Sequence, residues 1–435
     1  MRHLASKRRH RSHIMAVTAA LALLATACPA DDPDDPDAPE NGEVHIMGAF
    51  VDEHARSFER AIESFEEETG IDVTYEGSGD FETLIVSRVE GGNPPDIALF
   101  PQPGLMRDLA EGGHLRELSD ILEVDRLEQQ LVPGLLELGT HNDELVGVPY
   151  TVNIKSLVWY PIQPFEEAGY EIPETWDELH ALSDQIRDDG TAPWCVGIES
   201  AGATGWVATD WVEDVMLRTA GPDAYDDWVD GELPFDSPEV RHAFETVGDI
   251  WFEEGYVLGG TTAIITTPFG DAPAPLFDDP PSCFLHRQAG FITGFFPEDV
   301  EVGVDVDFFY LPPIEEEHGS PVLGAGDVGS LLTDNPSAEE VLRFLTTPEA
   351  LEERVQTGGD LSPNTEFDAS VYPTESQRRQ FEILVEADVY RFDASDMMPG
   401  AVGAGTFWTE SVNWIEAEGD NLDEVLQRID DSWPE

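Results

Sequence analysis

The sequence has little positive charge. It contains 22 Lys and Arg against 90 Asp and Glu, for a formal net charge of −68, and after Lys7 the only lysine is Lys155. This deficit excludes a nucleic acid partner, because a phosphate backbone is bound through many basic contacts. It also opposes docking on anionic lipid headgroups. We interpret the excess acid as adaptation to high salt, where screening limits self-repulsion. A surface selected for a cationic partner is the alternative.

Long apolar runs are also missing. The run from Ile14 to Leu24 is too short to cross a bilayer, since a span needs ~20 apolar residues. It follows a basic flank and ends at Ala25-Thr26-Ala27-Cys28, which is typical of a secretory signal. A cysteine after small residues resembles the lipobox of bacterial lipoproteins. We therefore predict a lipoprotein signal peptide at 1–27, lipidation of Cys28, and a location outside the cytoplasm, held to the cell membrane by the lipid alone. Ordinary secretion without lipid is the alternative.

Only three cysteines are present, and the motifs of several site classes are absent. With Cys28 lipidated, Cys195 and Cys283 remain in an oxidising compartment, so we predict a disulfide between them; two unrelated buried thiols are the alternative. The sequence contains no CxxC, HExxH or clustered His spacing, and we expect no metal and no cofactor. It also lacks a nucleophile elbow, a Ser-His-Asp motif and a P-loop, so no motif indicates an enzyme.

Strands and helices alternate after an acidic, proline-rich linker at 28–43. We expect a strand at 44–48, a helix ending at Thr69-Gly70, a strand at 71–75, a helix capped by Asp80, and an apolar strand at 97–100. This order predicts a parallel α/β sheet. Because ligands bind at the carboxyl ends of strands in such sheets, the following loops supply the first candidate site residues, Phe50, Asp52, Asp80 and Gln102.

Further helices are expected in the second half of the chain. The patterns predict helices over 176–186 and 205–217, and a C-terminal helix capped by Asn421. Mature length, about four hundred residues, fits two or three domains.

Several motifs together carry a resemblance to a known family. The stretch 147–160 reads Gly-Val-Pro-Tyr-Thr-Val-Asn-Ile-Lys-Ser-Leu-Val-Trp-Tyr, and Pro173-Glu174-Thr175-Trp176-Asp177-Glu178-Leu179 follows it. Asn93-Pro94-Pro95-Asp96 precedes the strand at 97–100. The pattern resembles the solute-binding proteins of bacterial carbohydrate ABC importers, which are maltose-binding-protein-like. Three further segments resemble the α-glucoside-binding branch of that family: Trp194-Cys195, Gly202-Ala203-Thr204-Gly205-Trp206 and Ser282-Cys283-Phe284.

The resemblance implies a fold class, a function and partners. The fold would be α/β and periplasmic-binding-protein-like, with two lobes, interleaved chain crossings and a cleft between the lobes. Lobe one would comprise 44–151 and 306–348, and lobe two 152–305 and 349–435. The protein would be a monomer that captures a carbohydrate, an α-glucoside or short oligosaccharide, and delivers it to the permease subunits of an ABC transporter.

Sugar binding needs planar hydrogen-bonding groups beside aromatic platforms. The resemblance assigns such roles to residues of the crossing strand and of later loops: Asn153, Glu199, Trp206, Asp210, Trp211, Arg287, Gln288, Phe291, Asp327 and Trp408.

Several of the candidate residues also have a structural interpretation, and Trp408, which precedes a helix, could be a packing staple. Trp206 and Trp211 could pack in a core, Asp210 could be a surface charge, and Asp80 and Asp327 could cap helices. Lys155 is expected to form a salt bridge at the hinge. Two functional alternatives stay open as well: a cell-surface glycoside hydrolase or lyase using paired carboxylates, and a binding protein for a non-sugar solute such as a polyamine.

Overall fold

A computed structural model describes residues 42–357 and 360–434. The predicted signal peptide, Cys28 and nearly all of the predicted linker lie outside these residues. Within them, no helix is both long and apolar enough to cross a membrane.

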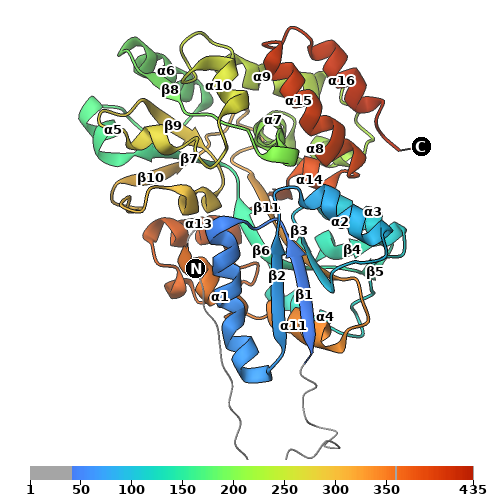
Figure 1. Ribbon diagram of the computed structural model, residues 1–435. Coiled ribbons are helices and arrows are strands. Elements are labelled where there is room, and N and C mark those ends of the chain that lie inside the picture. Colours follow the sequence, from blue (N-terminus) through green and yellow to red (C-terminus); the bar gives the residue numbers. More distant parts are fainter. Residues whose placement is uncertain (1–41, 358–359, 435) are drawn as a thin grey trace, which may run out of the picture. The chain divides into compact units, whose positions relative to one another are not determined.

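The first sheet begins with the predicted parallel strands. β1 (Glu43–Gly48) pairs in parallel with β2 (Asp72–Gly77) and with β3 (Ile97–Phe100). They lie side by side in Figure 1, with α1 (Asp52–Thr69) and α2 (Phe81–Glu90) connecting them. Gly70 ends α1 with φ 73°, the left-handed conformation that suits glycine. The first five elements expected from the sequence are therefore present.

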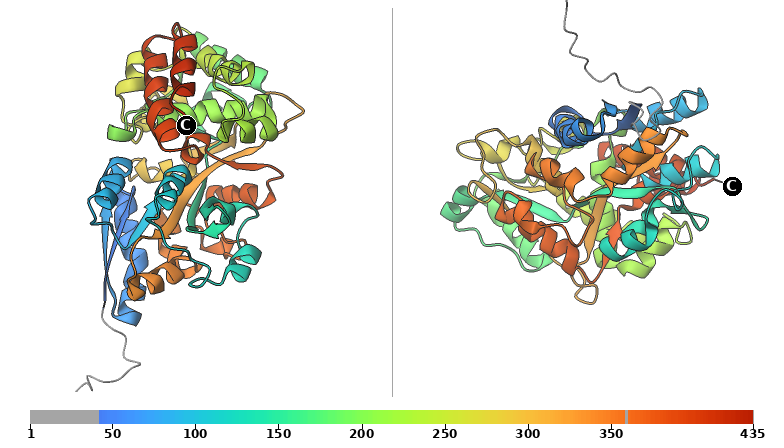
Figure 2. Two further views of the ribbon diagram at one scale, coloured as in Figure 1. Left: turned by 90° about the vertical axis from the view of Figure 1, so that its right-hand side faces the viewer. Right: turned by 90° about the horizontal axis from the view of Figure 1, so that it is seen from below.

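Two further long strands extend this sheet. β11 (Val322–Leu331) pairs antiparallel with β3 and with β6 (Val148–Ile154), and in parallel with β12 (Tyr390–Phe392). Figure 2 shows β11 running lengthwise between the two groups of helices. Residues 324–329 of β11 have the Gly-x-Gly-x-x-Gly spacing of dinucleotide loops but lie inside the strand. There a Cβ on Gly326 would meet the Thr151 carbonyl oxygen at 2.1 Å, so the glycine allows β6 and β11 to approach closely.

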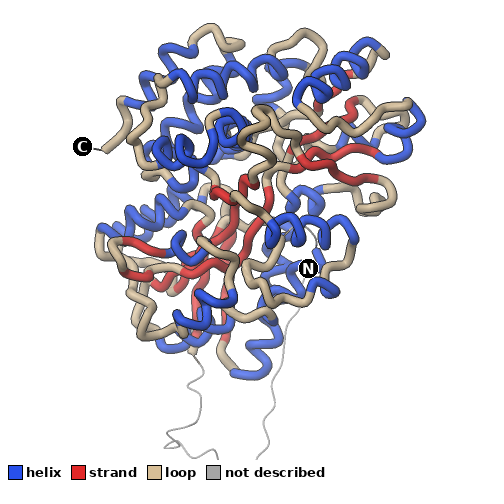
Figure 3. Tube along the Cα trace, turned by 180° about the vertical axis from the view of Figure 1, so that it is seen from behind, coloured by secondary structure: helices blue, strands red, loops and turns tan. Residues whose placement is uncertain are grey.

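A second sheet follows directly from β6. Its strand order is β10 (Val306–Tyr310), β7 (Leu157–Pro161), β9 (Cys283–Arg287), β8 (Ala192–Trp194). Only Lys155 and Ser156 separate β6 from β7, so the chain passes from the first sheet to the second over two residues. Figure 3 shows the strands of both sheets from behind.

Helices surround both sheets, and a two-residue hairpin, β4 (Thr140–His141) with β5 (Glu144–Leu145), lies apart. The predicted helices at 176–186 and 205–217 are present as α6 and α7, and Thr175 caps α6 by accepting from the Glu178 amide. The remaining helices are α3 (Pro103–Glu111), α4 (Val124–Gln130), α5 (Ile162–Ala168), α6 (Trp176–Asp188), α7 (Trp206–Thr219), α8 (Gly221–Val229), α9 (Pro238–Trp251), α10 (Gly260–Thr266), α11 (Pro336–Leu345), α12 (Glu349–Thr357), α13 (Glu375–Glu386), α14 (Ala394–Met397), α15 (Trp408–Glu416) and α16 (Leu422–Asp430).

Two large hydrophobic cores define two lobes. The first core, which defines the first lobe, draws on residues 44–154, on β11 and on residues 338–392. The second core, which defines the second lobe, draws on residues 158–323 and 394–429, and a smaller core lies against β7 and β9. Residues between 350 and 392 pack in the first core, whereas the predicted lobe two included all of 349–435. The exact lobe boundaries stay a prediction.

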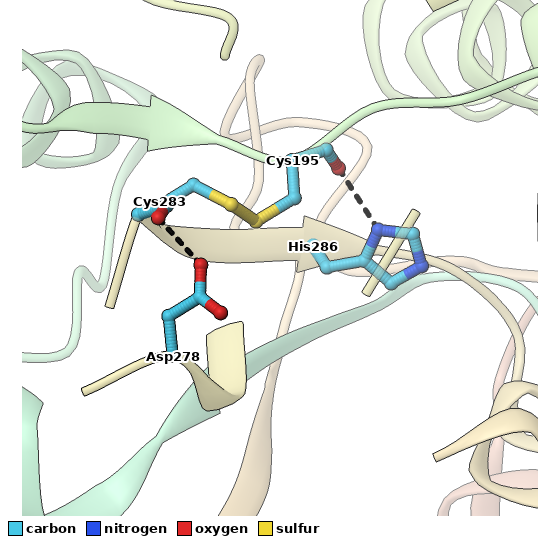
Figure 4. The surroundings of a disulfide bond; sticks show 5 residues. Cys195, Asp278, Cys283 and His286 are labelled. Atoms are coloured by element: carbon cyan, nitrogen blue, oxygen red, sulfur yellow. Dashed lines mark hydrogen bonds between the residues drawn. A yellow bond between two sulfur atoms is a disulfide. The ribbon is translucent and has the colours of Figure 1, made fainter. Parts of the chain in front are cut away.

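The predicted disulfide between Cys195 and Cys283 is confirmed. Their Cα atoms lie 5.6 Å apart, and 88 positions separate them in the sequence. The bond joins the residue after β8 to the first residue of β9, and the ring of His286 lies beside it with Nδ1 2.9 Å from the Cys195 carbonyl oxygen (Figure 4).

Candidate functional site

One face of the crossing strand β6 carries a row of polar side chains. Thr151, Asn153 and Lys155 alternate along an extended chain, so they point to the same side, and all three are buried. Each contacts a carboxylate from a distant part of the sequence. Thr151 Oγ1 donates to Asp327 (2.7 Å), Asn153 Nδ2 donates to Asp360 (3.2 Å), and Lys155 Nζ pairs with Asp210 (2.6 Å) and Asp393.

The second-lobe end of this row is a buried charge cluster around Lys155. Burial opposes the charge of the Lys155 ammonium, but the carboxylates of Asp210 and Asp393 outweigh burial and raise its pKa. For Asp393 burial is likewise outweighed, by Lys155 and by hydrogen bonds, so its pKa is lowered. The salt bridge expected for Lys155 is thus present. The interpretation of Asp210 as a surface charge is wrong, since its side chain is fully buried.

The Lys155 cluster contains more carboxylate groups than the single ammonium of Lys155 can neutralise. Oxygen atoms of Asp210, Glu213 and Asp393 all lie within 4.8 Å of one another. Glu213 accepts the amides of Ala394 and Ser395 at 3.0 Å each. Burial and then the charge of Asp393 raise the pKa of Glu213, and burial first of all raises that of Asp210. Three carboxylates could ligate a cation, but the Lys155 ammonium already contacts two of them.

The two candidate tryptophans of α7 have different surroundings. Trp206 is partly exposed, and its ring lies 5.2 Å from Phe269, 6.0 Å from Phe291 and 5.4 Å from Lys155 Nζ. Trp211 is buried in the second core between Trp194 and Trp251. Only Trp206 therefore presents an aromatic face beside the polar row.

Trp408 is buried against the start of α7. Its Nε1 donates to Ser395 Oγ (3.2 Å), and Ser395 in turn donates to Asp393. Its carbonyl oxygen would lie 2.4 Å from a Cβ at Gly205, whose φ is 125°, so only glycine fits there. Trp408 thus supports the Lys155 cluster through Ser395.

Arg287 and Gln288 lie at the end of β9 and are buried. Arg287 Nη2 donates to Asp214 (2.6 Å), its Nη1 lies 3.9 Å from Asp210 Oδ2, and its guanidinium lies over Trp211. Gln288 Oε1 accepts the Ala289 amide (2.8 Å), which is a local backbone contact. Arg287 therefore adjoins the cluster, whereas the Gln288 oxygen serves the loop.

The first-lobe end of the row is a second buried cluster. Asp360 joins Asn153 to Arg354, whose guanidinium lies 3.7 Å above the ring of Phe50. Asp327 is adjacent, and burial raises its pKa to about 6, although the Thr151 hydroxyl and Arg354 act in the opposite direction. Asp327 lies inside β11, so the interpretation of it as a helix cap is wrong.

Other candidates have contacts outside these two clusters. Asp80 makes no side-chain cap bond to α2; its Oδ1 accepts the Gly202 amide (3.1 Å) and so joins the first lobe to the second. Gln102 is buried and donates to Glu82 (2.9 Å). Glu199 accepts the Ala201 amide (2.9 Å) within its own loop. Asp52 is exposed at the first residue of α1.

Sequence reasoning missed several residues of both clusters. Arg354, Asp360, Glu213 and Asp393 carry no motif, although the polar alternation in an otherwise apolar strand was a signal that buried partners must exist.

Comparison with known proteins identifies the family of the chain. Residues 52–352 match the family of bacterial extracellular solute-binding proteins. The chain is 46% identical over 392 residues to the osmoprotective compounds-binding protein GgtB of Synechocystis sp., covering 90% of this chain and 92% of that one. It is 42% identical over 398 residues to the alpha-glucosides-binding periplasmic protein AglE of Rhizobium meliloti, covering 89% and 86%.

Solved structures with the same fold are more distant in sequence. RafE in complex with raffinose has a TM-score of 0.71 at 20% identity, over 90% of this chain and 98% of that one. Maltose-bound MalE3 of T. maritima has a TM-score of 0.69 at 16% identity, over 89% and 99%. The two-lobed fold and the resemblance predicted from the sequence are confirmed.

Proposed function

Because the chain belongs to the family of bacterial extracellular solute-binding proteins, we propose that it captures an α-glucoside and delivers it to an ABC import permease. Membership implies a location outside the cytoplasm and a role in transport, so the alternative of a glycoside hydrolase or lyase is set aside. We further propose that the protein is a monomer anchored through lipid on Cys28.

The polar row on β6 beside Trp206 is the observation that carries this proposal. A sugar presents hydroxyl groups around its ring and C–H groups on its faces, so it needs planar hydrogen-bonding groups next to an aromatic surface. Asn153 and Asp210 supply the first, and Trp206 with Phe291 supplies the second. The name of the relative AglE supports an α-glucoside.

Within the candidate set, the structure gives some residues a stronger case than others. The proposal relies on Phe50, Asn153, Trp206, Asp210, Phe291 and Asp327, which belong to the two clusters or adjoin them. Asp80 is proposed to act at the lobe boundary through Gly202. Arg287 adjoins the Lys155 cluster at Asp210, and Trp408 supports it through Ser395, but both side chains are buried and both residues stay predictions. Asp52, Gln102, Glu199, Trp211 and Gln288 stay predictions without a specific contact that favours them.

A small osmoprotective solute is the second candidate ligand. The relative GgtB, at 46% identity, is named for osmoprotective compounds. The net charge of −68 fits a protein that works in salt, where such solutes are useful.

A thermal-shift screen in high salt tests both candidates. Trehalose, sucrose, maltose, glucose, glycerol, glycine betaine and spermidine would each be added to the mature protein. A ligand at a hundredfold excess over its Kd stabilises the native state by about 2.7 kcal/mol, so the true class should raise the melting temperature clearly. We expect an α-linked disaccharide to give the largest shift and to be recovered intact.

Other outcomes discriminate between the alternatives. A shift with betaine alone would favour the osmoprotectant, and a shift with spermidine alone would favour a polyamine. The absence of any shift with a sugar would contradict the proposed function.

A further inference from the structure

Arg354 is a buried cation with an unmatched donor. Its side chain, on α12, is 1% exposed. Nε lies 2.6 Å from Asp360 Oδ2, and Nη1 donates to the His54 carbonyl oxygen at 3.2 Å. By hydrogen-bond geometry, neither Nε nor Nη2 has a partner among the described residues, so Nε meets Asp360 as an ion pair only and Nη2 meets no acceptor. Leaving a donor of a buried charged group without a partner is costly, so this atom needs an explanation, and a bound ligand is one.

The acceptor that would complement this donor lies on the other side of Asp360. Asn153 Nδ2 donates to Asp360 Oδ1 at 3.2 Å, which fixes the orientation of the amide. Asn153 Oδ1 is buried and likewise has no partner within the described part of the chain. One carboxylate therefore holds an unmatched donor and an unmatched acceptor on its two flanks.

The guanidinium is also held in a fixed plane. It lies 3.7 Å from the ring centroid of Phe50, and Phe50 is itself packed against Phe58 and Tyr75. Asp360 and Phe50 together leave Arg354 little rotational freedom. A donor fixed in this way loses little entropy when it binds a ligand.

This cluster lies at the boundary of the two lobes. The carbonyl that accepts from Arg354 belongs to His54, whose ring stacks on Phe295 at 5.4 Å and meets Phe291 edge-on at 6.3 Å. Those phenylalanines lie on the second-lobe segment Gly290–Phe295, and Phe291 also contacts Trp206. Asn153 and Lys155 are neighbours on one face of the chain, ~6.6 Å apart along the strand.

We infer that Arg354 and Asn153, both held by Asp360, form a hydroxyl-binding subsite on the first-lobe side, and that Arg354 determines specificity there. A hydroxyl group both accepts and donates, so it satisfies Arg354 Nη2 and Asn153 Oδ1 together. The subsite deepens the proposed function and rests on it. Since the Lys155 cluster with Asp210 lies at the other end of the row, the ligand class is a glycoside with hydroxyl groups on two linked units.

The test uses a conservative variant and a matched control. Arg354→Lys keeps the charge but loses the forked donors. Arg379→Lys is the control, because Arg379 also lies over a phenylalanine ring (Phe308, 4.3 Å) and pairs with an aspartate (Asp307, 2.7 Å), but at β10 and away from the polar row. Calorimetry would measure the affinity for maltose, trehalose and sucrose, and denaturant midpoints would report folding.

We expect Arg354→Lys to raise the Kd of the tightest of these sugars at least about tenfold, and Arg379→Lys to stay within about twofold. Monodeoxy analogues of that sugar give a second measurement on the wild-type protein. To the wild type, at least one analogue should bind about tenfold more weakly than the parent sugar. To Arg354→Lys, the same analogue should bind about as tightly as the parent sugar.

Three outcomes would overturn the inference. If folded Arg354→Lys binds the sugar with unchanged affinity, the subsite is contradicted and the proposed function stays intact. The same conclusion follows if the wild-type protein binds every monodeoxy analogue as tightly as the parent sugar. A wild-type protein that binds none of the sugars would overturn the proposed function, and the subsite with it.

Discussion

Trp206 and Trp211 lie five residues apart on α7 but should respond differently to removal. Trp211 packs between two tryptophans of the second core, so Trp211→Ala should cost about 3–5 kcal/mol of stability, with affinity falling only as the protein unfolds. Trp206 is partly exposed beside Lys155. Trp206→Ala should therefore weaken sugar binding and change the denaturant midpoint much less. Calorimetry and urea unfolding of both variants check this, and equal affinity of folded Trp206→Ala and wild type would contradict it.

Asp327 should make stability depend on pH in a definite direction. Burial raises its pKa to about 6 in the folded protein, above the ordinary value near 3.8. Between these values the folded chain holds a proton that the unfolded chain has released. The contribution of Asp327 to stability is therefore present at low pH and lost as pH rises from about 4 to about 6.

Asp327→Asn isolates this effect, because the amide resembles the protonated acid and can still accept from Thr151. Relative to wild type, the variant should gain up to about 3 kcal/mol of unfolding free energy between pH 4 and pH 7. Urea unfolding without ligand across this range measures the difference. Asp334→Asn, whose side chain is 96% exposed, is the control. If the difference in unfolding free energy between Asp327→Asn and wild type does not change with pH, the raised pKa of Asp327 is contradicted.

At the scale of elements, the disulfide closes the long loop that runs from the end of β8 to the start of β9. On the loop-entropy account, a separation of 88 residues corresponds to about 4–5 kcal/mol. The double variant Cys195→Ala/Cys283→Ala should lose an amount of this order, measured by denaturant midpoint. Reductant should lower the wild-type midpoint equally and leave the double variant unchanged; a reductant effect on the double variant would show that the effect has another cause.

The helices and strands that could be predicted are those whose spacing of hydrophobic residues can be read within their own segment of the sequence. β1, β2, β3 and the helices between them follow from alternating or three-to-four spacing. Helix caps were less predictable. Thr175 does cap α6, but neither Asp80 nor Asn421 makes a side-chain cap bond, because each side chain finds a partner elsewhere: Asp80 accepts from Gly202, and Asn421 donates to the Asn413 carbonyl.

The candidate site was predictable in part, and several of its contacts on one side only. The crossing strand with Asn153 and Lys155 could be found from the sequence, and so could Asp210 and Trp206. Their partners could not, since Asp360 lies 207 positions from Asn153 and Asp393 lies 238 positions from Lys155. With 90 acidic residues in the chain, composition alone cannot select these two. The packing of residues 350–392 in the first core is a long-range effect of the same kind.

At the scale of the whole molecule, the net charge of −68 should make stability depend on salt. Screening shortens the reach of repulsion from ~8 Å at 0.15 M to ~3 Å at 1 M ionic strength. The melting temperature should therefore rise when sodium chloride is increased over that range at neutral pH. Near pH 4.1, the isoelectric point of the sequence, the rise should be much smaller. A melting temperature that is independent of salt at pH 7 would contradict adaptation to high salt.

Lys155 has a practical consequence for experiments on this protein. Beyond residue 7 it is the only lysine, and it is 3% exposed between two carboxylates. Within the described residues, an amine-acylating reagent therefore has a single lysine to modify, and it can do so only when the Lys155 cluster opens and the amine loses its proton. The acylation rate at this one position, followed by mass spectrometry, therefore reports how often the chain between the two sheets opens. A bound ligand should lower this rate.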